Sequence, residues 1–471
     1  MLKNLIFIGA ASLIAFGAGF ANETLAADNK SDTEKLENSP SRYSDKVKGL
    51  KEQQDLPPRP VPLIEFWQDY VNEGPYEHEF ELPTGMVVSP GLIVYGNLST
   101  GLEHSDTGTE STTEWVTTLN LFANLTLSGT ERILLGVSPL TRRTGSKTRY
   151  PFEPTSDWHG ETGARLTAAF FEGELSEMFP RLDWDGRRPL DYQISFGRQG
   201  VVSQGGILIN DSMDSIAITR STIPFTGTNF ARIGGFVGVN NVHRSNNMDD
   251  NEAELYAIFS AVEAGHATYE LDLAYVDSDT AGGDQFNVGA SFIHPFIILE
   301  HDVDTTIRVA NSSTPGGAET AAATDGSLLY TSFSFAPKKT DDIVYINAFG
   351  GINNYATASR MMGTGGPLSI VGLLFAGNGL AGAPINNFSN KAWGGSVGYQ
   401  MFFSDALRRN LILELGGKSD NSAGGVDRFG AAVRYSQALG QHVFFEVGGY
   451  AVDQESTDNA YGIRTKLNIV F

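Results

Sequence analysis

Segments in which hydrophobic and polar residues alternate with a period of two recur through most of the chain. In one of them Trp115, Thr117 and Leu119 alternate with polar positions that include Glu114 and Asn120. Because successive residues of a β-strand point to opposite faces of the sheet, this alternation predicts strands with one apolar and one polar face. Eighteen strands are predicted in this way, near residues 88–102, 114–127, 131–140, 163–173, 190–199, 214–220, 230–239, 253–262, 267–277, 285–293, 299–309, 327–336, 342–350, 392–403, 410–417, 428–437, 442–451 and 460–471.

The connections between these strands alternate in length, as in a transmembrane antiparallel up-and-down β-barrel with short periplasmic turns and longer outer loops. The short connections are 128–131, 263–266, 337–341, 404–410 and 438–441. The longer or more polar ones are 141–162, 200–213, 240–252, 310–326, 351–391 and 452–459. The connection 174–189 is an exception, since it is long and falls on the periplasmic side. A barrel of sixteen strands remains an alternative if 214–220 and one neighbour are not strands.

The N-terminal residues 1–27 have the pattern of a cleaved export signal. Lys3 precedes an apolar run from Leu5 to Phe20, and cleavage is expected after Ala21 or after Ala26 or Ala27. A membrane anchor helix is the alternative, although the run is short for one. Residues 28–84 then form a charged, proline-containing periplasmic arm, and 85–471 form the barrel. The aromatic segment 64–70 is expected to dock in the barrel floor, bind a periplasmic partner or contact the first strands.

The last eleven residues form a strand whose length suits a bilayer crossing. Its apolar face consists of Tyr461, Ile463, Leu467, Ile469 and Phe471. A chain that ends on an aromatic residue of this face resembles the terminal insertion signal of bacterial outer-membrane barrels. The resemblance implies the barrel-assembly machinery, outer-membrane lipid and lipopolysaccharide as partners.

Composition narrows the function further. The chain has 471 residues, a formal net charge of −22 and no cysteine. The acidic balance argues against a nucleic-acid partner, and the absence of cysteine excludes disulfides and thiolate metal sites. Gly394 to Gly398 matches the G-x-S-x-G nucleophile pattern, but residues at strand spacing follow it where that motif needs a strand–turn–helix. No enzyme activity, metal or cofactor is therefore predicted.

The polar faces of the predicted strands supply candidate pore-lining residues. The inward acids are Glu114, Glu270, Asp272, Asp302, Asp304, Glu414 and Glu446, and the inward bases are Arg308, Arg428, Arg434, Arg464 and Lys466. Arg198 and Arg220 fall on the apolar positions of their strands. Because arginine on the lipid face costs about 2–4 kcal/mol, these two are expected beyond the lipid belt or turned inward by a bulge. The lumen is thus predicted to be mixed in charge.

The segment Ser195 to Gln199, together with Ile209 to Asp211 and Asp214 to Ile218, resembles the alginate-export family of outer-membrane barrels. In that family Gly-Arg-Gln ends one strand and Asp-x-(Val/Ile) opens the returning one. The resemblance implies eighteen strands and, in the type member, a conduit for a secreted polyanionic polysaccharide. A mixed lumen suits that cargo poorly, because a polyuronate channel should be basic.

The sequence therefore predicts a porin-like channel for the passive passage of small solutes or ions. The alternatives are a polysaccharide-export conduit and a barrel sheath around a redox or other partner protein. The loop 351–391 carries the apolar run Leu368 to Phe375 and is predicted to fold over or into the mouth and narrow the pore. An ordinary surface loop is the alternative. Another outer loop carries the basic residues Arg142, Arg143, Lys147 and Arg149. They are a candidate site for lipopolysaccharide phosphates or for attracting anions, and a solvated cluster of loop charges is the favoured alternative.

Overall fold

The computed structural model describes residues 61–67, 79–142, 145–182, 190–279, 282–316, 318–377, 382–403, 408–455 and 457–471. The predicted signal peptide and most of the predicted arm lie outside these residues. In the described chain the main sheet has 21 strands. Three of them, β1, β7 and β20, are short additional strands, and the other eighteen form the wall of the barrel. These are β4 Gly91–Asp106, β5 Ser111–Thr126, β6 Arg132–Ser138, β8 Arg165–Glu174, β9 Gln193–Ser203, β10 Ile209–Arg220, β11 Phe230–Asn240, β14 Ala253–Ala264, β15 Ala267–Ser278, β16 Gln285–Ile298, β17 His301–Ser313, β18 Gly326–Phe335, β19 Ile343–Asn353, β21 Ala392–Phe402, β22 Arg409–Asp420, β23 Arg428–Ala438, β24 Val443–Gln454 and β25 Ala460–Val470.

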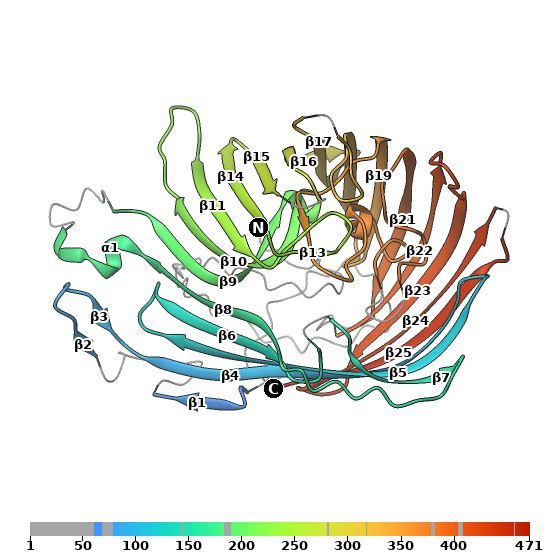
Figure 1. Ribbon diagram of the computed structural model, residues 1–471, viewed down its shortest axis with the longest axis horizontal. Coiled ribbons are helices and arrows are strands. Elements are labelled where there is room, and N and C mark those ends of the chain that lie inside the picture. Colours follow the sequence, from blue (N-terminus) through green and yellow to red (C-terminus); the bar gives the residue numbers. More distant parts are fainter. Residues whose placement is uncertain are drawn as a thin grey trace, which may run out of the picture.

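The wall strands form a closed antiparallel barrel, because the last strand β25 pairs with the first, β4 (Figure 1). The prediction of an eighteen-strand barrel is confirmed, and each predicted range overlaps one wall strand. Even the weakest of them, 214–220, is a strand and begins earlier, at Ile209. Pairing of β25 with β4 removes the open edges that the first and last wall strands would otherwise expose to lipid.

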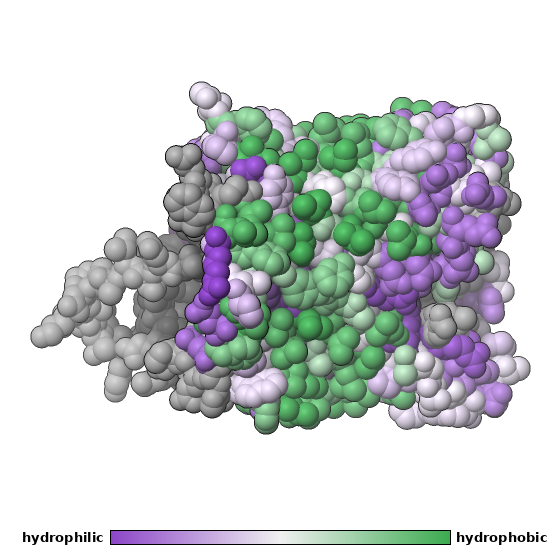
Figure 2. Space-filling model, turned by 60° about the vertical axis from the view of Figure 1, so that its left-hand side comes forward, coloured by the Kyte–Doolittle hydropathy of each residue, from purple (hydrophilic) through white to green (hydrophobic). Residues whose placement is uncertain are grey.

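The outer face of the barrel is apolar around its middle. Figure 2 shows a band of hydrophobic residues between two polar margins. In β22, Leu413 and Leu415 are about half exposed on this face, whereas Glu414 between them is 2% exposed and points inward. The period-2 pattern has therefore separated lipid-facing from inward-facing side chains. Among the described residues there is no helix long and apolar enough to cross a membrane.

The two faces of β23 offer a test of this orientation. Val433 is exposed on the outer face, and its neighbour Ala432 lines the interior. We expect Val433→Lys to lower the free energy of unfolding by about 2–4 kcal/mol, because the charge must enter lipid. The matched variant Ala432→Lys should cost much less. Denaturant titrations of the barrel refolded into lipid vesicles measure both, and equal costs would contradict the assigned faces.

The seam of the barrel is extended by residues from the predicted arm. Phe471 exchanges backbone hydrogen bonds with Gly96, at 3.0 and 2.7 Å, and ends β25 there. Below that point β1 (Ile64–Phe66) pairs with the remaining edge of β4, with Ile64 opposite Val94. The described part of the aromatic segment therefore contacts the first wall strand, while residues 68–70 lie outside the described chain. The hairpin β2 (Phe80–Glu81) and β3 (Val87–Val88) spans the predicted boundary at 84/85.

Three connections differ in kind from a plain loop. The connection 141–162 contains β7 (Thr148–Glu153), which pairs with β5 beyond the end of β6. The connection 174–189 contains the short helices α1 (Leu175–Met178) and η2 (Pro180–Leu182) in its described part. The prediction of 200–213 as an outer loop is wrong. Its residues extend β9 and β10 and turn into the barrel, where Ile207, Leu208, Ile209 and Met213 are buried.

Candidate channel and its internal plug

The hairpin of β9 and β10 leaves the barrel wall near its middle. β8 pairs with β9 only as far as Arg198, and β11 pairs with β10 only as far as Asp214. Gly197 stands at the departure point with φ +120°, and a Cβ there would lie 2.2 Å from the carbonyl oxygen of Ala169. Only glycine accommodates both the backbone angle and this approach. Residues 199–213 therefore turn into the barrel as a paired unit.

The tip of this hairpin reaches the inner wall at β15 and β17. It contains η3 (Gln204–Gly206), and Gln204 donates from Nε2 to Oδ2 of Asp272 in β15 at 2.9 Å. Ser203 donates to the same oxygen at 2.5 Å. The guanidinium of Arg308 in β17 packs against Gly205, where a Cβ would lie 3.0 Å from Cζ. Polar groups of β15 and β17 thus hold the tip.

The long loop between β19 and β21 also folds inside, as Figure 1 shows. Five of its apolar side chains are fully buried and form one cluster with Tyr355 and with inward residues of the wall. These five are Leu368, Val371, Leu374, Phe375 and Ile385, and the wall members include Leu328, Tyr330 and Phe349. The prediction that 351–391 folds into the barrel is confirmed for its described residues. The apolar run is buried there because a solvent-exposed run of this size would be costly.

The loop is fastened to the wall through its backbone. The carboxylate of Glu414 in β22 accepts from the amides of Leu373 and Leu374, at 2.9 and 2.8 Å, and from the hydroxyl of Tyr345. Lys418, four residues along β22, donates to the carbonyl of Phe388 at 2.7 Å. Ser396 of the G-x-S-x-G pattern is a strand residue and donates to the carbonyl of Val371 at 2.6 Å.

Hairpin and loop pack on one another and are called the plug here: residues 199–213, 354–377 and 382–391. β20 (Ser359–Arg360) runs parallel to β10, with Ile209 opposite Ser359. The side chain of Arg360 is fully buried and donates to the carbonyls of Gly206 and Gly365, at 2.7 and 2.6 Å. Burial lowers the pKa of Arg360 to about 10, so its guanidinium stays charged at neutral pH.

The plug corrects part of the predicted pore lining. Asp272 and Glu414 point inward as expected, but both are covered by the plug and are at most 5% exposed. The guanidinium of Arg308 is likewise covered by the hairpin tip at Gly205. Sequence alternation assigns the face of a strand, whereas a distant segment that folds onto that face decides whether water reaches it. These three residues hold the plug and do not line an open channel.

Glu414 provides a local test of this role. In Glu414→Ala the amides of Leu373 and Leu374 lose their acceptor in a buried position, where an unmade hydrogen bond costs about 1–3 kcal/mol. We expect those two amides to exchange hydrogen much faster, by one order of magnitude or more. Glu414→Gln keeps one acceptor oxygen, so its exchange rates at these amides should lie between those of the natural protein and of the alanine variant. Unchanged exchange at both amides in the alanine variant would contradict the anchoring role.

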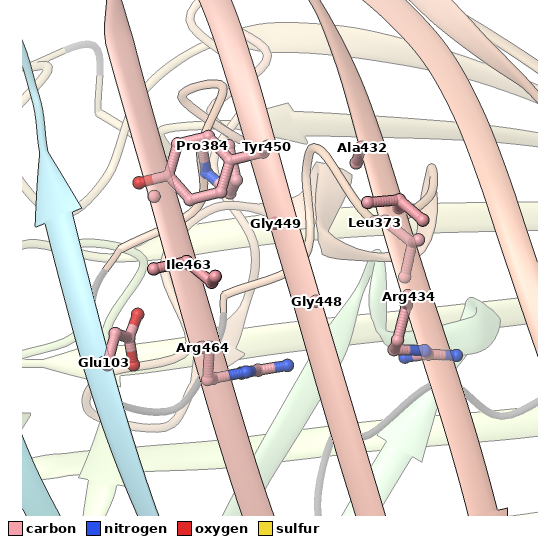
Figure 3. Close-up of a pocket in the computed structure, with 12 residues that line it drawn as sticks. Glu103, Leu373, Pro384, Ala432, Arg434, Gly448, Gly449, Tyr450, Ile463 and Arg464 are labelled. Carbon is pink, nitrogen blue, oxygen red and sulfur yellow. The ribbon is translucent and has the colours of Figure 1, made fainter.

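A small, partly open space, called the passage here, lies between the plug and the wall of β23, β24, β25 and β4. It is bordered by Leu373 and Pro384 of the plug. On the wall side, Figure 3 shows Arg434 and Arg464 projecting from β23 and β25, with Glu103 on β4. Charged side chains of both signs therefore face apolar plug residues across this passage.

The charges of this wall are partly paired with one another. Arg464 donates from Nη2 to Oε1 of Glu446 at 2.8 Å. Lys466 lies in the electrostatic field of Glu446, Arg464 and Arg434. Glu114 forms an ion pair with Arg149 at 3.3 Å. Partial pairing leaves the wall mixed in charge.

The remaining predicted pore residues lie elsewhere in the interior or outside it. Asp302 and Asp304 share the inward face of β17 with Arg308 and are exposed, and Glu270 shares the inward face of β15 with Asp272. Arg428 is inward in β23 and donates from Nε to the side chain of Gln454 at 2.8 Å.

Arg198 and Arg220 do not line the passage. Arg198 lies on the same side of β9 as exposed Phe196 and makes two hydrogen bonds to Asp214, at 2.8 and 2.9 Å, where the hairpin leaves the wall. Arg220 ends β10 on the side of exposed Ile216 and Ile218, with its guanidinium 5.3 Å from the centre of the Tyr192 ring.

Some charged residues of the interior are not among the predicted ones, and Glu103, Lys418 and Lys147 show why. Glu103 and Lys418 lie one residue beyond the predicted ends of their strands, at 102 and 417, and both continue the inward alternation. Longer strands would have included them. Lys147 lies in the connection after β6 and interacts electrostatically with Glu103 and Glu114. A loop residue has no alternation to follow, so the sequence placed Lys147 in the basic outer stretch and not in the interior.

Comparison with solved structures shows the same architecture in outer-membrane porins of Pseudomonas aeruginosa. The OccK2 (OpdF) structure has a TM-score of 0.55 and 10% identity, covering 80% of this chain and 98% of that one. OccK3 (OpdO) has a TM-score of 0.52 and 11% identity, covering 80% and 95%. The structure of OpdK with vanillate has a TM-score of 0.54 and 10% identity, covering 81% and 98%. The chain therefore shares the closed-barrel fold of these porins.

At these identities the similarity concerns the fold alone. No protein-family model matches the chain. No curated protein matches it either. These neighbours support the general prediction of an outer-membrane barrel porin and not the resemblance to the alginate-export family.

Proposed function

We propose that this protein is an outer-membrane channel through which small solutes or ions diffuse. The observation that carries the proposal is the closed barrel of eighteen wall strands, in which Glu103, Arg434 and Arg464 line a space between the plug and the wall. A barrel of eighteen strands is wide enough for an aqueous channel when side chains alone occupy its interior. Here the plug occupies part of that width and leaves a narrow, charged route.

The apolar band supports a location in the outer membrane, with lipid around the barrel and the C-terminal strand as the element that the assembly machinery would engage. Lipopolysaccharide contact through the basic outer stretch has less support. Arg142 is paired with Glu161 at 2.8 Å and Arg149 with Glu114, while Arg143 lies outside the described residues. Within the described chain we find no contact that favours a polysaccharide conduit or a sheath around a partner protein.

Two measurements on the refolded full-length protein test the channel. In planar bilayers we expect discrete single-channel steps, because a barrel of eighteen strands leaves width for an aqueous route beside the plug. In liposome swelling we expect small sugars to enter and larger oligosaccharides to be excluded by the plug. Heat-denatured protein is the control. A folded barrel that produces neither conductance steps nor swelling would overturn the proposal.

A further inference from the structure

Three segments of the interior meet at the carboxylate of Asp211, in the part of β10 that has left the wall. Oδ1 accepts from the amide of Ser212 at 2.7 Å and from Nδ1 of His243 at 2.8 Å. Oδ2 accepts from the amide of His243 at 2.9 Å and from the hydroxyl of Ser359 at 2.5 Å. The side chain of Asp211 is fully buried, and that of His243 is 4% exposed.

These partners come from parts of the chain that are far apart. Asp211 belongs to the inward hairpin, and His243 belongs to β12 (Val242–His243) in the connection between β11 and β14. Ser359 begins β20 in the first part of the long loop, and it also donates to the carbonyl of His243 at 2.9 Å. One carboxylate therefore accepts hydrogen bonds from both other segments and joins them to the hairpin.

The other ends of the plug are fixed separately. The root of the hairpin is held by the ion pair of Arg198 and Asp214, and its tip by Asp272. The second part of the loop is held on the wall by Glu414. Between these points the first part of the loop is held by its pairing with β10, by Arg360 and by Asp211. Gln285 and Asn287 of β16 also hold it, because they donate to the carbonyls of Ala356 and Thr357. Asp211 differs from these contacts in joining the loop and the β11–β14 connection to the hairpin at one carboxylate.

We propose that Asp211 is a positioning residue of the channel: it holds the first part of the long loop and the β11–β14 connection on the inward hairpin and so limits the width of the lumen. The proposal rests on the channel function above. Without this carboxylate, the amide and Nδ1 of His243 lose their buried acceptor, and Ser359 keeps only its bond to the His243 carbonyl. A buried donor without an acceptor is costly, so the segments separate to reach water.

The test compares single-channel conductance of Asp211→Ala with the natural protein. We expect an increase of about two-fold or more with frequent flickering, because part of the plug is released into a lumen that it normally narrows. Asp427→Ala is the matched control. Asp427 also accepts from a backbone amide, that of Asp420 at 2.8 Å, but it lies outside the plug, and its loss should leave conductance unchanged.

A disulfide rescue separates positioning from general destabilisation. Ile209 and Ser359 are direct register partners, and the chain has no cysteine of its own. In the variant Ile209→Cys, Asp211→Ala, Ser359→Cys, oxidation should restore the tie and the natural conductance, and reduction should raise the conductance again. If Asp211→Ala alone does not fold, the triple variant can be folded in its oxidised form and then reduced for the measurement. Conductance equal to that of the natural protein in the reduced variant would overturn the role of Asp211.

Failure of this inference is distinguishable from failure of the channel itself. If the natural protein conducts and the variants behave like it, the channel stands and the role of Asp211 falls. If the natural protein does not conduct but the reduced variant does, the open-channel function falls and the role of Asp211 stands. A merely structural effect would not reverse on oxidation and reduction.

Discussion

Removal of the central part of the long loop is expected to raise single-channel conductance several-fold. The segment 367–386 begins and ends at neighbouring points, because the amide of Leu368 donates to the carbonyl of Asn387 at 3.0 Å. The amide of Gly366 also donates to the side chain of Asn387 at 2.6 Å. A Gly–Ser linker between Gly366 and Asn387 can therefore replace the segment without moving the strands that flank it.

The reason for the increase is the volume that this segment occupies. Its buried cluster fills the lumen beside β18, β19 and β22, and Leu373 and Pro384 border the passage. Planar-bilayer recording measures the conductance, and liposome swelling with sugars of graded size should show larger solutes entering. Shortening the β10–β11 connection at residues 224–227, away from the plug, is the control. A folded deletion variant with the natural conductance would contradict the idea that this loop narrows the pore.

Reversal of two charges in the passage is expected to change ion selectivity strongly. Arg434 and Arg464 project from β23 and β25 beside Glu103 and Glu446. In Arg434→Glu, Arg464→Glu the wall becomes acidic, and Glu446 loses its cationic partner. Rings of one sign favour ions of the opposite sign, so the permeability ratio of cations to anions should rise several-fold.

The reversal potential under a salt gradient measures that ratio. Arg142→Glu is the control, because Arg142 is a largely exposed loop residue paired with Glu161, outside the passage. It should leave the ratio near its natural value. If the double variant folds and conducts with an unchanged ratio, ions do not travel along the wall of β23–β25, and the passage has been assigned wrongly.

The barrel could be predicted because its strands repeat one simple requirement. Each wall strand must place apolar side chains in lipid and polar or small ones inside. This requirement produces an alternation with a period of two among neighbouring residues. The ends of the strands are harder to predict from this alternation than their centres. Glu103 and Lys418 lie just beyond predicted ends because pairing with neighbouring strands carries the hydrogen bonding further than the hydrophobic signal does.

The inward hairpin could not be predicted in the same way. The segment around Gly197 carries the residues that resemble the alginate-export family. In the structure these residues lie where the hairpin leaves the wall. Gly197 permits the turn, and Arg198 is paired with Asp214 at the point of departure. In the sequence, however, residues 200–213 look like a loop, because their burial depends on β15, β16 and β20, which lie far away in the chain.

By itself the sequence determined the strand number, the closed barrel and the face of each inward charge, since these follow from local alternation and the lengths of connections. Only the tertiary structure decided which inward charges meet water. Glu414 and Asp272 are covered by segments distant from them in sequence, whereas Arg434 and Arg464 remain beside the passage. The physical reason is that burial of a polar side chain depends on long-range packing and hydrogen bonding, and neither leaves a periodic trace along the chain.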